Sequence, residues 1–177
     1  MDNTSIESAV WVIPQARGEG KISLNMEEVY LLEHRKNEIS SVTKVSAKNL
    51  MRAFEKGFQR VSRYYAVITE QLALIEEDCK SRDAEVQLTI APKKLKELGL
   101  LRPGFPAGSD DLRRSVVQLD TEYKALMTKH AELTAFKELI KAKQEGFKMA
   151  FYSVKAVYDS LDNGVPNSME EEYVEKG

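Results

Sequence analysis

An uninterrupted apolar repeat over residues 51–79 constrains this chain more than any other feature. Its members alternate between spacings of three and four, and they are Met51, Phe54, Phe58, Val61, Tyr65, Ile68, Leu72, Ile75 and Cys79. A straight α-helix repeats every ~3.6 residues, so a strict apolar period of ~3.5 predicts a helix that supercoils against a partner. We expect one long helix over about 43–90, ended because Ala91 precedes Pro92.

A second repeat supplies the partner helix, which we expect over about 109–162. It keeps one register from Leu112 to Leu161, and Ser109 or Asp110 is its expected cap. Its only positions that are neither apolar nor aromatic share one heptad position and are His130, Lys137 and Gln144. Two long helices with a short connection fold back antiparallel. The predicted fold class is therefore all-α, a long antiparallel helical hairpin or coiled coil, although each repeat could instead pair in parallel with another chain.

The flanking segments divide the chain into three parts. Residues 1–24 form an irregular N-terminal arm, residues 25–162 a single helical hairpin domain, and residues 163–177 an acidic disordered tail. Asn25 and Glu28 have the spacing of a capping box, which predicts a short helix over about 26–37. The poor helix formers at 40–43 predict a break before the first long helix.

The arm contains an apolar cluster that requires cover. Trp11, Val12 and Ile13 lie in it, directly before Pro14, and Trp11 is the only tryptophan. An exposed apolar cluster of this kind marks a contact surface. The arm is either a strand-like segment that packs on its own helices or a segment that docks on a neighbouring subunit. In the second case these three residues are oligomer contacts.

Basic residues are concentrated in two groups that the predicted hairpin places at one end. The first, in residues 44–63, holds six cations against one acid, Glu55, and comprises Lys44, Lys48, Arg52, Lys56, Arg60 and Arg63. The second lies near the end of the second helix and comprises Lys137, Lys141, Lys148 and Lys155. A row of cations replaces the counterions of a nucleic-acid backbone. The alternative is a solvated helix face that pairs with acids from another segment or subunit.

Tyr64 follows this first group of cations directly. A tyrosine beside arginines is able to stack on an unpaired base, as in proteins that bind single strands. The alternative is that Tyr64 packs half-buried against the chain's own helices.

Several classes of protein are disfavoured by the residues that are scarce. One cysteine excludes a disulfide within the chain, and one cysteine with two histidines makes no credible zinc site. No glycine-rich phosphate loop is recognisable, and no segment reads as a signal peptide or a membrane span. We expect a cytoplasmic protein (of the host cell if viral) that is not an enzyme and uses no cofactor or metal.

The segment from Arg63 to Tyr158 resembles the UvsY-like recombination mediator proteins of T4-type phages. The resemblance is carried by Arg63-Tyr64-Tyr65 before an acidic helix, the run from Arg113 to Tyr123, and a long helix with Phe147-Lys148 near its end. It implies an all-helical subunit that forms a homo-oligomer, binds single-stranded DNA, contacts a single-strand binding protein and helps to load a recombinase. The apolar arm, the helix at 26–37 and the acidic tail depart from that family's pattern.

Two functions therefore stay open. The first is a single-stranded DNA binding accessory protein of recombination or replication, whose binding residues are the basic residues named above. The second is a structural or adaptor coiled-coil protein that acts through protein contacts, either as a phage assembly protein or in a chaperone-like role.

Overall fold

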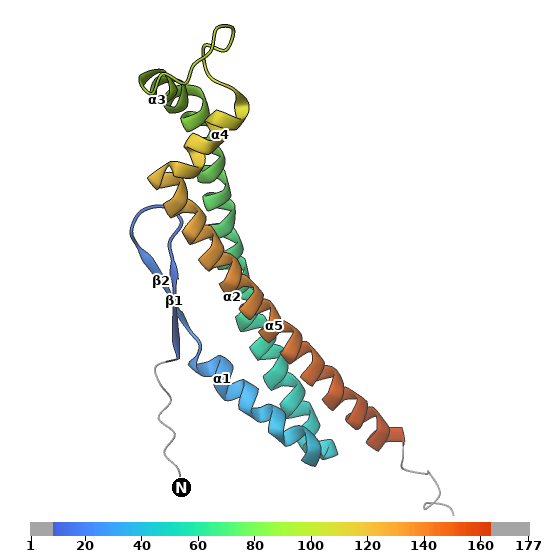
Figure 1. Cartoon of the computed structure of the whole chain (residues 1–177). Coiled ribbons are helices and arrows are strands. Elements are labelled where there is room, and N and C mark those ends of the chain that lie inside the picture. The colour runs from blue at the N-terminus through green and yellow to red at the C-terminus, as the bar shows by residue number, and fades with distance from the viewer. Residues whose placement is uncertain (1–8, 164–177) are drawn as a thin grey trace, which may run out of the picture. The chain divides into compact units, whose positions relative to one another are not determined.

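The structure, a computed structural model, describes residues 9–163, and most of them are helical (Figure 1). The predicted tail, with Glu170, Glu171 and Glu172, and the first eight residues of the arm lie outside the described part. The mostly helical character predicted from the two repeats is confirmed. No helix within the described part is long and apolar enough to cross a membrane.

The arm, which the sequence predicts as irregular but strand-like, forms a β-hairpin over residues 10–25. Strand β1 (Val10–Pro14) pairs with strand β2 (Lys21–Asn25) in a two-stranded sheet. The connection between them is short, with Gly18 at φ +85° and a hydrogen bond from Gln15 N to Gly20 O. Glycine adopts this backbone conformation without the steric cost that other residues meet.

Helix α1 (Glu27–His34) is shorter than predicted and continues as a 3-10 helix, η1 (Arg35–Ser41). Asn25 Oδ1 accepts a hydrogen bond from Glu27 N, but Glu28 does not complete the predicted capping box. Its carboxylate pairs with the two cations Lys56 and Arg60 instead. The predicted break is confirmed at Val42, whose backbone is extended.

Helix α2 (Lys44–Glu85) starts with a reciprocal cap, in which Ser46 N donates to Thr43 Oγ1 and Thr43 N donates to Ser46 Oγ. The predicted end before Pro92 is wrong. A π turn, η2 (Val86–Ile90), and helix α3 (Ala91–Glu97) continue the helical path past the proline. Ala91 N donates to Val86 O, so the hydrogen-bond register changes just where Pro92 lacks a donor.

The second long helix is two helices, which is a further correction. Helix α4 (Asp110–Leu119) has Ser109 as its N-cap, as predicted, and helix α5 (Thr121–Asn163) follows after an extended Asp120. Asp120 Oδ1 accepts a hydrogen bond from Tyr123 N and so caps α5. The apolar repeat does not reveal such a break, because the apolar residues before and after it continue the same three- and four-residue spacing.

The chain divides into two compact units, to each of which α2 and α5 contribute a segment. Unit 1 comprises residues up to Trp11, Asn25–Tyr64 and the segment from Ile140 onward. Its large buried side chains are Met26, Val29, Leu50, Phe54, Val61, Ile140, Phe147 and Val154. Fully burying a side chain of this size stabilises a fold by about 1.5–3 kcal/mol.

Unit 2 comprises Val12–Leu24 and Tyr65–Leu139. Its buried residues along the long helices and the hairpin include Ile13, Leu24, Ile68, Leu72, Ile75 and Leu133. A separate cluster joins η2, α3 and α4 and comprises Val86, Ala91, Leu95, Val116 and Val117. The hairpin loop is held by Ala16 N, which donates to Gln71 Oε1, and by Lys129 Nζ, which donates to Gly18 O.

Candidate nucleic-acid interface

The first basic group is partly neutralised within unit 1. Lys56 Nζ lies 2.6 Å and Arg60 Nη1 2.8 Å from the two carboxylate oxygens of Glu28 on α1. The bond from Lys56, with the charge of Arg60, lowers the pKa of Glu28. The acid that sequence reasoning could not assign to these two cations is therefore Glu28, in accordance with the alternative of a paired helix face.

The remaining predicted cations of α2 differ in their surroundings. Lys48 Nζ lies 5.8 Å from the ring centroid of Tyr158, and Lys44 is exposed and has an interaction partner. Arg52 and Arg63 are exposed, and no described residue pairs with either. They lie about three turns apart on the same side of the helix. These two arginines keep their full charge available to a ligand.

On α5 the predicted basic group divides between the two units. Lys137, in unit 2, is half-buried, with Nζ 5.6 Å from the ring centroid of Tyr65. Lys141, Lys148 and Lys155, in unit 1, are exposed, and no described residue pairs with them. They recur about every two turns, so they form a row along one side of α5. The second group thus supplies unit 1 with three unpaired cations.

An aromatic groove in unit 1 lies between the α2 and α5 segments and has a volume of 270 Å³. Its lining comprises Phe54, Glu55, Phe58, Phe147, Lys148, Phe151 and Tyr152. Phe58 is 38 % and Tyr152 56 % exposed, so both rings present surface to solvent. The rings of Phe151 and Tyr152 pack edge to face, with their centroids 5.7 Å apart. Sequence reasoning missed this groove because Tyr152 stands outside the apolar repeat.

Tyr64, the aromatic residue that the sequence favoured for stacking, is committed elsewhere. Its hydroxyl donates to Asn25 O at 2.5 Å, and Arg60 Nε donates to that hydroxyl at 3.3 Å. The side chain is half-buried. Of the two possibilities given for Tyr64, the structure therefore agrees with a half-buried side chain that packs against its own chain.

The predicted oligomer contacts have unequal exposure. Ile13 has no exposed surface, and Trp11 Nε1 donates to the hydroxyl of Tyr30 at 3.1 Å. Val12 is 46 % exposed. Of the three residues, Val12 has the largest exposed fraction.

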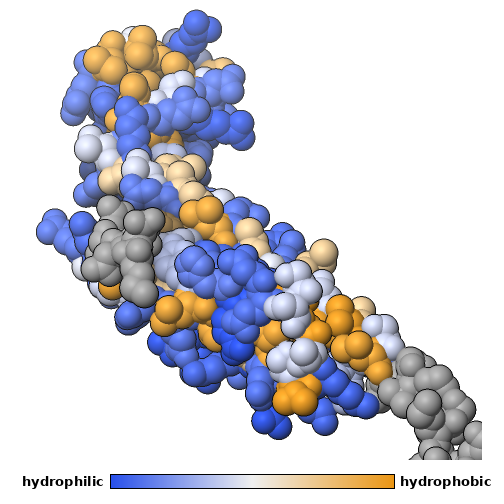
Figure 2. All heavy atoms as spheres, turned by 90° about the horizontal axis from the view of Figure 1, so that it is seen from below, coloured by the Kyte–Doolittle hydropathy of each residue, from blue (hydrophilic) through white to orange (hydrophobic). Residues whose placement is uncertain are grey.

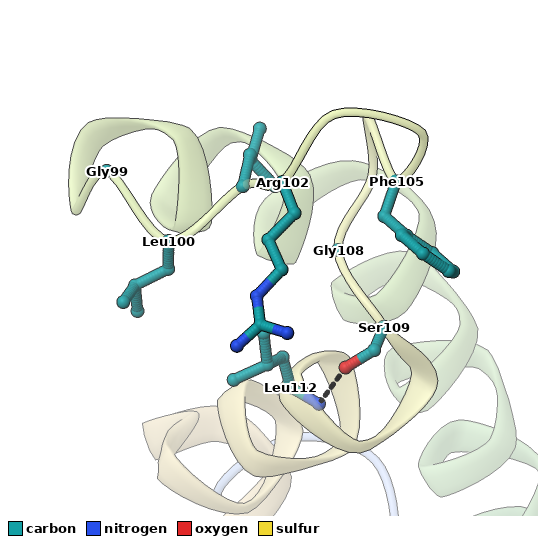
Figure 3. A pocket seen from close by; sticks show the side chains of 8 residues that line it. Gly99, Leu100, Arg102, Phe105, Gly108, Ser109 and Leu112 are labelled. Carbon is teal, nitrogen blue, oxygen red and sulfur yellow. Dashed lines mark hydrogen bonds between the residues drawn. The ribbon is translucent and has the colours of Figure 1, made fainter.

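A second pocket, in unit 2, is formed by the loop between α3 and α4 and has a volume of 540 Å³. Figure 3 shows the guanidinium of Arg102 extending toward Leu112, with Leu100 and Phe105 on either side. A tight turn shapes the loop, with Phe105 N donating to Arg102 O and Gly104 at φ +88°. No described residue pairs with the guanidinium of Arg102. The pocket thus combines apolar walls with one unpaired cation.

On the face drawn in Figure 2, exposed apolar side chains lie in separate groups between hydrophilic residues. Within residues 9–163 no group of three or more His, Cys, Asp and Glu side chains is placed to hold a metal ion.

The thiol of Cys79 has a raised pKa, first because of burial and then because of the nearby charges of Asp78 and Glu76. Raising the pKa disfavours the reactive thiolate.

Comparison with known proteins gives no independent guide to function, because no family model, curated protein or solved structure matches the chain. The resemblance to recombination mediators therefore stays a prediction.

Proposed function

We propose that this chain is a non-enzymatic accessory protein that binds single-stranded DNA through unit 1. The observation that carries the proposal is the coincidence of unpaired cations and an aromatic groove in one unit. In the unit 1 segments of α2 and α5, the five exposed cations without a described partner are Arg52, Arg63, Lys141, Lys148 and Lys155. Cations supply affinity for phosphate, and exposed rings supply a surface for unpaired bases.

The rest of the proposal follows the sequence resemblance. In it, α2 and α5 pair as an antiparallel coiled coil, the chain assembles into a homo-oligomer in the cytoplasm, and it assists the loading of a recombinase. Two contacts within unit 1 support the antiparallel pairing, namely Phe54 with Phe147 and Ser62 with Gln144. The residue that lies further along α2 contacts the residue that lies earlier along α5. Oligomerisation would multiply weak DNA contacts by raising the effective concentration of each further site.

The test is binding of a labelled single-stranded oligonucleotide at several salt concentrations. We expect the logarithm of the affinity to fall linearly with the logarithm of the salt concentration. The triple variant Arg52→Glu, Arg63→Glu, Lys148→Glu should lower the slope by about 2, since each lost phosphate contact lowers it by about 0.7. These residues make no ion pair with a described residue, so helicity should be unchanged.

A matched control uses cations of unit 2. Lys93 and Lys96 are also exposed and have no described partner, but they lie on α3. The double variant Lys93→Glu, Lys96→Glu should bind as the unaltered chain does. A loss in both variants, in proportion to the number of charges reversed, would indicate attraction by total charge alone, and no binding by the unaltered chain at low salt would refute the proposal.

The adaptor function remains the second candidate, and the loop pocket of unit 2 favours it. Exposed apolar side chains around an unpaired arginine suit an acidic segment of another protein with an apolar residue. Arg102→Glu should leave DNA binding unchanged if the two surfaces act separately. A partner protein that binds the unaltered chain but not this variant would support the adaptor function.

A further inference from the structure

We propose that the aromatic groove of unit 1 holds unpaired nucleobases, which stack on Phe58 and Tyr152. This inference rests on the proposed function and deepens it, because it names the part of the nucleic acid that occupies the groove. It also assigns the cations beside the groove to the phosphates. Tyr64, whose hydroxyl is bonded to Asn25 O, has no part in it.

The exposure of the rings is the first argument. Aromatic side chains of a helical repeat are ordinarily covered by the partner helix, as Phe54 and Phe147 are, both without exposed surface. Phe58 belongs to the same repeat and is 38 % exposed, and Tyr152 is 56 % exposed. Both line the groove, so an occupant would cover them. Flat apolar rings that lie open to solvent offer the contact on which bases stack.

The size of the groove is the second argument. Pockets for small organic ligands enclose about 300–1,000 Å³. The groove, at 270 Å³, falls just below that range, and it is open along one side, as the exposed rings show. It therefore suits the flat end of a longer chain rather than an enclosed small molecule. A nucleobase attached to its backbone has that form.

Two charged side chains in the groove lining favour the base at one position and the phosphate at another. Glu55 and Lys148 both line the groove, and neither pairs with a described residue. The carboxylate of Glu55 repels phosphate but accepts hydrogen bonds from the amino groups of bases. Lys148 attracts phosphate, and Lys141 and Lys155 continue its row along α5. Charge complementarity thus places bases over the rings and the backbone beside α5.

A duplex satisfies this arrangement poorly. Its bases are already stacked and paired inside the helix, and only unpaired bases can be placed on a protein ring. The groove therefore distinguishes single strands from duplexes, whereas the cations attract both. Loss of the rings should weaken binding of the single strand selectively.

The experiment compares three ligands with the full chain: a single-stranded oligonucleotide, an abasic strand of equal length, and a duplex. Tyr152→Leu and Phe58→Leu keep apolar packing but remove the flat ring. Each should weaken binding of the base-bearing strand about tenfold and leave the abasic strand and the duplex unchanged. Tyr152→Phe should bind as the unaltered chain does, because stacking needs the ring and not the hydroxyl.

A spectroscopic measurement accompanies the affinities. An oligonucleotide that carries 2-aminopurine should lose fluorescence on binding when the base stacks, and Tyr152→Leu should reduce that loss. If both leucine variants bind the base-bearing strand like the unaltered chain, the groove does not hold bases, while the proposed function stands. If the unaltered chain binds no single-stranded DNA, the proposed function and this inference both fail.

Discussion

The ring of Phe147 on α5 lies against the backbone of Gly57 on α2. A Cβ atom at Gly57 would come within 2.5 Å of Phe147 Cε1, which is closer than side-chain atoms approach. Phe147 has no exposed surface, so its ring cannot move aside without displacing other core residues. The glycine thus sets how closely the two segments of unit 1 approach.

The first prediction is that Gly57→Ala destabilises the chain by about 1–3 kcal/mol, the ordinary cost of overpacking a core. Gly146→Ala is the matched control, because its Cβ would meet only Lys36 Nζ, the far end of a flexible side chain. That control should be neutral or stabilising by up to about 1 kcal/mol, since alanine favours a helix over glycine. Denaturant unfolding measures both. Equal signs for the two variants would contradict this account of the packing.

The second prediction concerns Glu28, which occupies two cations of the predicted DNA-binding group. Glu28→Gln should release Lys56 and Arg60 from their ion pairs and raise the affinity for single-stranded DNA several-fold at low salt. The salt dependence should steepen by about 0.7 for each cation that gains a phosphate. Binding titrations at several salt concentrations measure both effects.

Glu27→Gln is the control for charge alone, because Glu27 is an exposed neighbour without an ion pair to any described residue. The same gain in both variants would mean that Lys56 and Arg60 do not contact DNA.

The third prediction concerns Asp120, which joins two segments of unit 2. Arg82 Nε and Nη2 lie 2.9 and 2.8 Å from its two carboxylate oxygens, and its side chain is 13 % exposed. Asp120→Ala removes both the ion pair and the cap of α5, and the cap alone contributes about 1 kcal/mol. Asp120→Asn keeps a capping side chain and loses the charge. Unfolding at pH 7 should therefore rank the unaltered chain above the Asn variant and the Asn variant above the Ala variant.

The same carboxylate predicts a dependence on pH. The bond from Arg82, more than any other interaction, lowers the pKa of Asp120 below its ordinary value of 3.8. A carboxyl group with a lowered pKa in the folded state stabilises the fold above its unfolded pKa, and this share is lost as the pH falls through the folded pKa. The stability difference between the unaltered chain and Asp120→Asn should thus shrink below about pH 4. A difference that stays constant down to about pH 2 would refute the assignment.

The fourth prediction concerns Lys143, which lies among aromatic rings in unit 1. Its Nζ atom is 2.8 Å from Glu33 Oε2, 4.6 Å from the ring centroid of Tyr30 and 5.9 Å from that of Trp11. Lys143→Met should destabilise the chain by about 1–3 kcal/mol, because a half-buried carboxylate loses a charged partner. The emission of Trp11, the only tryptophan, should shift in the folded state.

Lys141→Met is the matched control, since Lys141 is exposed on the same helix and has no described partner. It should change stability by less than about 0.5 kcal/mol and leave the emission unchanged. An unshifted emission in Lys143→Met would show that Trp11 does not lie beside this lysine.

The apolar repeat predicted burial well because spacing along a helix decides which side chains face a neighbour. Val61, Ile68 and Ile140, all members of the two repeats, have no exposed surface. The polar members also have partners: His130 lies 3.6 Å from Glu76, and Gln144 bonds to Ser62. The spacing of apolar residues along a helix is a local property, so it can be recognised in a single sequence.

The errors arose where a local preference competed with tertiary contacts. The preference against helix before proline was outweighed at Ala91, whose side chain is buried in the cluster with Leu95 and Val116. The ion pairs of Glu28 and the bonds of Tyr64 depend on how α1 packs on α2, which no spacing within either helix encodes. The candidate site changed accordingly, from a continuous row of cations to a few unpaired cations and an aromatic groove that one of them, Lys148, lines.

The π turn at Val86–Ile90 has a consequence for how this chain tolerates changes of length. A π turn accommodates one residue more than an α-helical turn, and one residue rotates the following side chains by about 100°. Loss of a residue there would restore a regular helix but turn Leu95 away from Val116 and Val117. The extra residue therefore behaves as an insertion that the cluster has come to require, and related chains should keep or lose it together with the apolar positions of α3.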